Sequence, residues 1–251
     1  MTGSVPPPPP DPSPPPPGTE RPPPEPTPGS LPAVGWGPGQ TLVGLAILLA
    51  ALLVEVSVIG TFDSDIESLG ARLGLQALLA LTLLAVAFFA ADPGELTAPG
   101  ELGLRRSLRP PVKPAILTYL VYVGCAILIA LVIQPEQDDV TDELGYGESD
   151  LANVATGFLI VAVAPITEEI FFRGFMFAGL RRRLPFVAAA AVSAGLWGLF
   201  HYTGAGTWGV VVQLAVFGIA LSWLYERTGS IWPPIAVHAV NNAIAFSILT
   251  S

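Results

Sequence analysis

Seven long apolar stretches, separated by short polar loops, follow one another between residues 40 and 249. A helix of about 20 apolar residues crosses the hydrocarbon core of a bilayer. The pattern therefore predicts an all-α polytopic membrane protein with about seven transmembrane helices. The predicted spans are Gln40–Gly60, Arg72–Ala91, Pro114–Ile133, Leu151–Leu180, Pro185–Tyr202, Trp208–Tyr225 and Ile231–Leu249.

The first 38 residues follow no such pattern, and they hold 17 of the 27 prolines. Proline has no backbone N–H and a fixed φ, so runs of it form neither helix nor sheet. We interpret residues 1–38 as a disordered, proline-rich, cytoplasmic tail; a docking site for an unidentified proline-binding partner is the alternative. Residues 39–150 then carry the first three spans, and residues 151–251 the last four.

Composition agrees with a membrane protein, since 51% of the residues are hydrophobic and only 12% are charged. The net charge of −9 excludes a nucleic-acid partner, which requires a basic surface. Lysine and arginine mark cytoplasmic loops, and they gather after the second, fourth and sixth spans. This alternation predicts an integral protein of the cell (plasma) membrane with a cytoplasmic N-terminus. The basic residues are Arg105, Arg106, Arg109, Lys113, Arg181, Arg182, Arg183 and Arg227.

Several polar side chains fall inside the apolar spans, where they are costly and therefore indicate function. Glu169 and Arg173 are four residues apart, the spacing of an ion pair on a helix. Glu168 points about 100° away from Glu169, so it remains for another partner. The fifth span contributes His201, and the seventh contributes His238 and Asn242. His201 and His238 are the chain's two histidines, and Asn242 follows the second by one helical turn.

These residues form three motifs that resemble those of a known family. The string from Glu168 to Arg173 resembles the EExxxR motif of the CAAX-protease and bacteriocin-processing (CPBP, or Abi) family of intramembrane endopeptidases, the type II CAAX prenyl endopeptidase-like proteins. The segment from Trp197 to His201 is similar to its FxxxH motif, with tryptophan in place of the usual phenylalanine. The segment from His238 to Asn242 matches its HxxxN motif. The exchange at Trp197 is expected to affect packing and no catalytic atom.

The resemblance implies that residues 151–251 form a catalytic membrane core that hydrolyses a peptide bond in a membrane-associated peptide or protein. The residue types allow this chemistry, because a buried carboxylate or imidazole can activate water. Glu168 is the expected base, and His201 would orient the water. His238 and Asn242 would donate to the oxyanion, with Glu169, Arg173 and Trp197 in support.

Three alternatives stay open. Glu168, His201 and His238 also make up a two-histidine, one-carboxylate set that suits catalytic zinc, although a version that requires no cofactor leaves a role for Asn242. The same polar groups would serve a proton-coupled transporter, or persist in a non-catalytic immunity scaffold. The groups of one site should lie at the same depth in the membrane, and here a difficulty arises. At about 1.5 Å per residue, His201 lies about 24 Å from the cytoplasmic end of its span, whereas His238 lies about 10 Å from that side. Tilted helices, or breaks near Pro165, would remove it.

Overall fold

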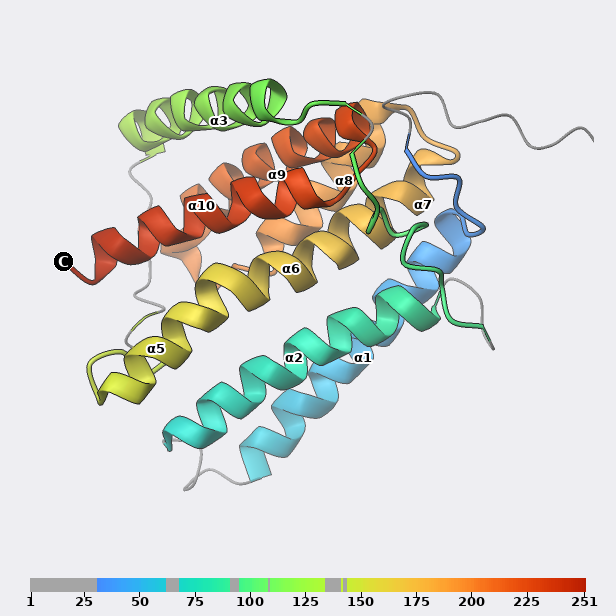
Figure 1. The fold of residues 1–251 in the computed structure, drawn as a ribbon. Coiled ribbons are helices and arrows are strands. Elements are labelled where there is room, and N and C mark those ends of the chain that lie inside the picture. The colour runs from blue at the N-terminus through green and yellow to red at the C-terminus, as the bar shows by residue number, and fades with distance from the viewer. Residues whose placement is uncertain (1–30, 62–67, 91–94, 108, 134–140, 142–143) are drawn as a thin grey trace, which may run out of the picture.

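The computed structural model describes residues 31–61, 68–90, 95–107, 109–133, 141 and 144–251. Over these residues the protein is built from helices alone, as the hydrophobic pattern predicts (Figure 1). The proline-rich stretch 1–30 lies outside the described residues, so its predicted disorder and its docking role remain predictions.

The helices follow the predicted spans closely. Each helical region begins and ends within a few residues of a predicted span, and the fourth region is made up of five consecutive elements. In chain order they are α1 (Pro38–Thr61), α2 (Leu69–Phe89), α3 (Val112–Ile133), α5 (Asp150–Phe158), η1 (Leu159–Val163), α6 (Ala164–Glu168), η2 (Glu169–Phe177), α7 (Ala178–Arg181), α8 (Phe186–Leu199), η3 (Ala205–Thr207), α9 (Trp208–Thr228) and α10 (Trp232–Leu249).

Length and composition single out four of these regions as able to cross a membrane, among the described residues: Leu69–Phe89, Val112–Ile133, Asp150–Arg181 and Trp208–Thr228. Two shorter apolar helices, Pro38–Val54 and Phe186–Leu199, accompany them. The helix α10 has 18 residues and carries the polar groups His238, Asn241 and Asn242. Together these helices form a polytopic membrane body of about seven helices.

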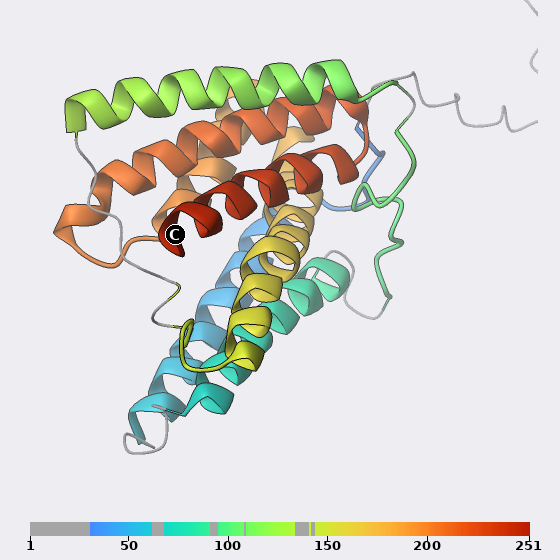
Figure 2. The same cartoon turned by 60° about the vertical axis from the view of Figure 1, so that its left-hand side comes forward.

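Two groups of helices cross each other. In Figure 2, α1, α2 and the helix from α5 onward run steeply, whereas α3, α9 and α10 run across them. The difficulty over depth does not arise in the structure, because the ring centroids of His201 and His238 lie 5.5 and 5.2 Å from that of Trp197. Glycines allow close approach where helices pack: a Cβ on Gly198 of α8 would lie 2.6 Å from the Val211 carbonyl oxygen of α9.

The fourth region is one unbroken helix through Pro165. The segments α5, η1, α6, η2 and α7 form a continuous stretch, Asp150–Arg181, whose two η segments are π-helical. A proline inside a helix removes a hydrogen bond and crowds the preceding turn, and a π-helical turn is one way of absorbing that disturbance. Here η1 directly precedes α6, in which Pro165 is the second residue. The expected break is therefore replaced by a local widening of the helix.

The end of the molecule that carries the basic loops is held together by hydrogen bonds between loops. Ile231 N–H donates to the Gly103 carbonyl at 2.9 Å, and Arg105 Nε donates to the Gly229 carbonyl at 2.7 Å. Arg181 pairs with Glu226 at 3.0 Å. The loops after the second, fourth and sixth helical regions thus lie together, as alternating spans require.

The predicted tail ends earlier than residue 38. Trp36 is 1% exposed and its Nε1 donates to the Phe175 carbonyl at 2.9 Å. Arg182 Nη1 donates to the Gly35 carbonyl at 2.7 Å. Residues 31–38 were predicted to belong to the tail because of its proline content, but the apolar indole of Trp36 anchors this segment.

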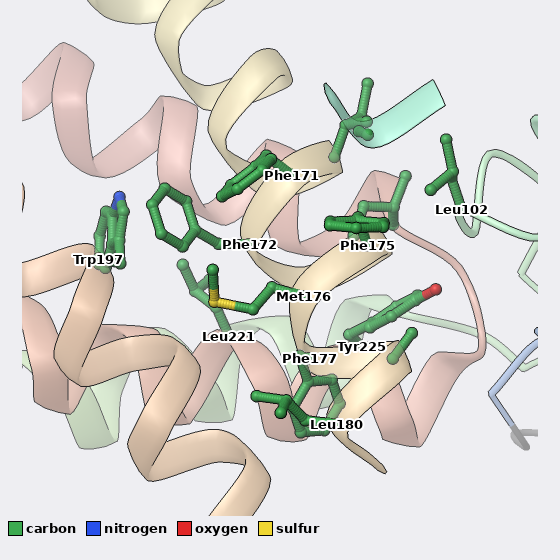
Figure 3. Close-up of a cluster of buried hydrophobic side chains, with 14 of the residues drawn as sticks. Leu102, Phe171, Phe172, Phe175, Met176, Phe177, Leu180, Trp197, Leu221 and Tyr225 are labelled. Atoms are coloured by element: carbon green, nitrogen blue, oxygen red, sulfur yellow. The ribbon is translucent and has the colours of Figure 1, made fainter. Parts of the chain in front are cut away.

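A core of aromatic side chains surrounds the middle of the long helix. Phe171, Phe175 and Phe177 of η2 are fully buried, and Figure 3 shows them grouped with Met176, Trp197, Leu221 and Tyr225. Buried aromatic rings fix a helix in rotation as well as in position. The core therefore fixes the orientation of the carboxylates at the start of η2.

Candidate active site

Glu169 lies at the centre of a buried charged cluster. Its Oε1 atom accepts from Arg173 Nη1 at 2.9 Å and lies 2.9 Å from Nδ1 of His238. Glu169 and Arg173 are 0% exposed, and His238 is 3% exposed. The four-residue spacing predicted the ion pair correctly. The contact with His238 of α10 comes from the fold, and it joins the first and third sequence motifs.

Glu168 is held by a different partner. Its Oε2 atom accepts from the indole Nε1 of Trp197 at 2.6 Å. The two neighbouring carboxylates therefore have separate environments, as their rotation around the helix predicts. The prediction for Trp197 was incomplete, because this side chain does more than pack: it donates a hydrogen bond that phenylalanine lacks.

The two histidines lie against the same indole. The centroid of the Trp197 ring is 5.5 Å from that of His201 and 5.2 Å from that of His238, both edge-on. His201 follows the C-terminus of α8, and its Nδ1 lies 2.9 Å from the Trp197 carbonyl. A carbonyl only accepts, so Nδ1 carries the proton and Nε2 of a neutral His201 is a free acceptor.

Asn242 bonds to the π-helical turn before Pro165. In such a turn each carbonyl accepts from the N–H five residues later, and Ala164 N–H accordingly donates to the Leu159 carbonyl. The corresponding donor for Ile160 would be Pro165, which has no N–H. Asn242 Nδ2 supplies it at 2.9 Å. One amide hydrogen of Asn242 is thus used by the backbone, and the second is left for another acceptor.

These groups share one cavity of about 520 Å³. The volume falls within the range of small-molecule sites. Helices far apart in the sequence line it, from α2 to α10. The predicted site residues among its walls are Glu168, Trp197, His201, His238 and Asn242. Glu169 and Arg173 are not among them; Glu169 contacts the cavity residue His238, and Arg173 contacts the ring of Trp197.

The donor set does not match a closed metal site. Among the described residues, no group of three or more histidine, cysteine, aspartate or glutamate side chains is arranged to hold a metal ion. Nδ1 of His238 faces Glu169, and one oxygen of Glu168 faces the indole.

Three amide side chains of the cavity wall were not predicted from the sequence: Gln76, Gln213 and Asn241. Each lies in an apolar helix, so the signal was present. It was overlooked because only ionisable groups, and the motif asparagine, were considered. Gln213 of α9 also donates to the Ala126 carbonyl of α3 at 3.3 Å, and thus ties a wall of the cavity to the helix packed outside it.

Comparison with known proteins agrees with the motifs and with this geometry. Residues 150–244 match the model of the family described as type II CAAX prenyl endopeptidase Rce1-like. Over these residues the chain is similar to the Rce1-like family. Its match begins at the first residue of α5 and ends in α10, so it includes every predicted site residue.

One curated relative of the Rce1-like segment is described as "Putative membrane peptidase YdiL" from Bacillus subtilis (strain 168). It is 35% identical over 80 residues, which is 32% of this chain and 31% of the relative. The alignment thus spans about a third of the relative's length. No solved structure matches the chain. The apolar helices and the Rce1-like segment together identify an integral membrane protein.

Proposed function

We propose that the protein is a membrane-embedded endopeptidase that hydrolyses a peptide bond in a membrane-associated peptide or protein. The observation that carries the proposal is the convergence of Glu168, His201, His238 and Asn242 on one cavity. Peptide hydrolysis needs a base for water and donors for the oxyanion, and these four side chains supply both. The Rce1-like match supports the same reaction class.

In the proposed reaction, water attacks the carbonyl carbon while its proton passes to Glu168. His201 Nε2 accepts a second hydrogen bond from that water and so orients it. The C–O bond forms, and the carbonyl oxygen becomes an oxyanion. The free amide hydrogen of Asn242 and an Nε2–H of His238, which the imidazolium form provides, donate to that oxyanion. The C–N bond then breaks, and the proton held by Glu168 passes to the leaving amine.

The proposal is tested with the full chain reconstituted in liposomes and a panel of fluorogenic membrane peptides. We expect cleavage by the wild type and a loss of at least a hundredfold in kcat for Glu168→Gln, because removal of a general base typically costs about 10²–10⁴-fold. Glu95→Gln is the control, since Glu95 is exposed and does not line the cavity. Equal turnover by Glu168→Gln would refute the assignment of the base.

We propose further that this chemistry needs no metal ion. The absence of a three-donor cluster among the described side chains supports this reading. Elemental analysis of protein purified without chelator, and cleavage after dialysis against phenanthroline, check it. Stoichiometric zinc together with loss of activity on chelation would instead favour the zinc-dependent alternative.

A further inference from the structure

We propose that Trp197 is a positioning residue of the reaction, whose indole N–H holds the Glu168 carboxylate in a single orientation toward the cavity. The inference rests on the proposed function, in which Glu168 is the base. It starts from the departure from the FxxxH pattern, because phenylalanine at this position has no hydrogen to donate.

The indole is itself immobile, which a positioning group requires. Trp197 is 1% exposed, and the guanidinium carbon of Arg173 lies 4.4 Å from the centre of its ring. The ring of Phe217 packs against the indole, with 6.1 Å between the two ring centroids. With its ring fixed by these neighbours, the N–H points in one direction. A donor held in this way costs no reorganisation when it acts.

The hydrogen bond leaves Glu168 able to work. It occupies Oε2 at 2.6 Å, and the side chain lines the cavity with its other oxygen available as an acceptor. A free glutamate side chain would lose rotamer freedom on binding water, and the bond to Trp197 removes much of that freedom in advance. Correct placement of a base relative to the water contributes directly to kcat.

Trp197 also contacts the other groups of the site. Its ring meets both imidazoles edge-on, and its carbonyl fixes the tautomer of His201. A simple truncation would disturb all of these contacts. The test must therefore remove the N–H and keep the ring.

The experiment replaces Trp197 by β-(3-benzothienyl)alanine in the full chain, so that sulfur takes the place of the N–H within a ring of almost the same shape. The substrate is a fluorogenic membrane peptide that the wild type cleaves. We expect kcat to fall roughly tenfold or more, as for the loss of a hydrogen bond to a charged group, with KM unchanged. The same replacement at Trp232, which lies outside the cavity walls, should leave both constants unchanged.

A double-mutant cycle provides a readout without catalysis. Thermal unfolding of the benzothienyl variant, of Glu168→Met and of the double variant should be non-additive, because each change alone breaks the same bond. Wild-type kcat in the benzothienyl variant, or additive unfolding, would overturn the proposal and leave the protease function standing. If the wild type cleaves no peptide, the protease function is refuted. The role of Trp197 in that reaction is then refuted as well, whatever the result of the double-mutant cycle.

Discussion

A single oxygen of Glu169 accepts from Arg173 and contacts His238, with all three side chains buried. Charges in such surroundings are tolerated only as long as each keeps its partner. The cluster gives little net stability relative to apolar residues of the same size, but the loss of one member leaves the others exposed to the full cost of burial. These residues therefore act as one unit.

Arg173→Met tests this unit. It should lower the free energy of unfolding by about 3–5 kcal/mol, because the Glu169 carboxylate is left with its histidine alone. Arg181→Met is the matched control in the same long helix: the Arg181–Glu226 pair is partly exposed, with both side chains at 31%, and should cost at most about 1 kcal/mol. Unfolding in detergent by titration with denaturing surfactant measures both. Equal losses of unfolding free energy in the two variants would contradict this explanation. So would a double variant, Arg173→Met with Glu169→Gln, that is no more stable than Arg173→Met alone.

At the level of single residues, sequence predicted what depends on local spacing. The Glu169–Arg173 pair and the separate environment of Glu168 follow from positions on one helix. The contact of His238 with Glu169, and that of Trp197 with Glu168, join residues from different helices. Nothing in a single sequence specifies which rotamers meet across such a gap, so these contacts could not be predicted.

The long helix depends on Asn242 of α10 where Pro165 interrupts its backbone bonding. Asn242→Ala should leave the Ile160 carbonyl without its partner and cost about 1–3 kcal/mol. In a Pro165→Ala background the new N–H can serve this carbonyl, so the same change at Asn242 should cost less. Chemical unfolding of the four proteins measures the difference. Asn241→Ala serves as control, since among the described residues no hydrogen bond joins its side chain to this turn. An equal cost in both backgrounds would refute the explanation.

Elements were predictable where hydrophobicity decides them. All seven predicted spans correspond to helices, because the end of an apolar run is also the end of a favourable helix in lipid. The π-helical turns η1 and η2 were not predicted. Their hydrogen-bond pattern differs from that of an α-helix by one residue per turn, and the choice between the two depends on packing around Pro165 and on Asn242 rather than on local composition.

For the whole molecule, the loop charges predict a cytoplasmic N-terminus, and residues 183 and 251 should lie on opposite sides of the membrane. In a Cys125→Ser background, Arg183→Cys should be protected from a membrane-impermeant maleimide added to intact cells, and Ser251→Cys should be labelled. Both positions are exposed in the structure, so packing does not shield them. The opposite labelling would show that the topology is inverted. Labelling of both positions would show that the two lie on the same side, with one span fewer between them than predicted.

The crossing of the two helix groups could not be obtained from sequence, although it decides how His238 of α10 comes to lie beside Glu169 of the long helix. Hydrophobicity gives the length and direction of each span but not its inclination. Inclination depends on side-chain volumes at contacts such as that of Gly198 with the Val211 carbonyl, where a methyl group would lie within 2.6 Å of the backbone.

Trp36 also determines where the chain can be shortened. Composition alone would place the cut at residue 39, just before the first apolar run. A chain that starts there would lack the indole that fills the space beside Phe175 and Gly179, on the same helix that bears Glu168 and Glu169. Removal of the proline-rich stretch for crystallisation or assay should therefore stop before Leu31, so that a loss of activity is not mistaken for a role of the prolines.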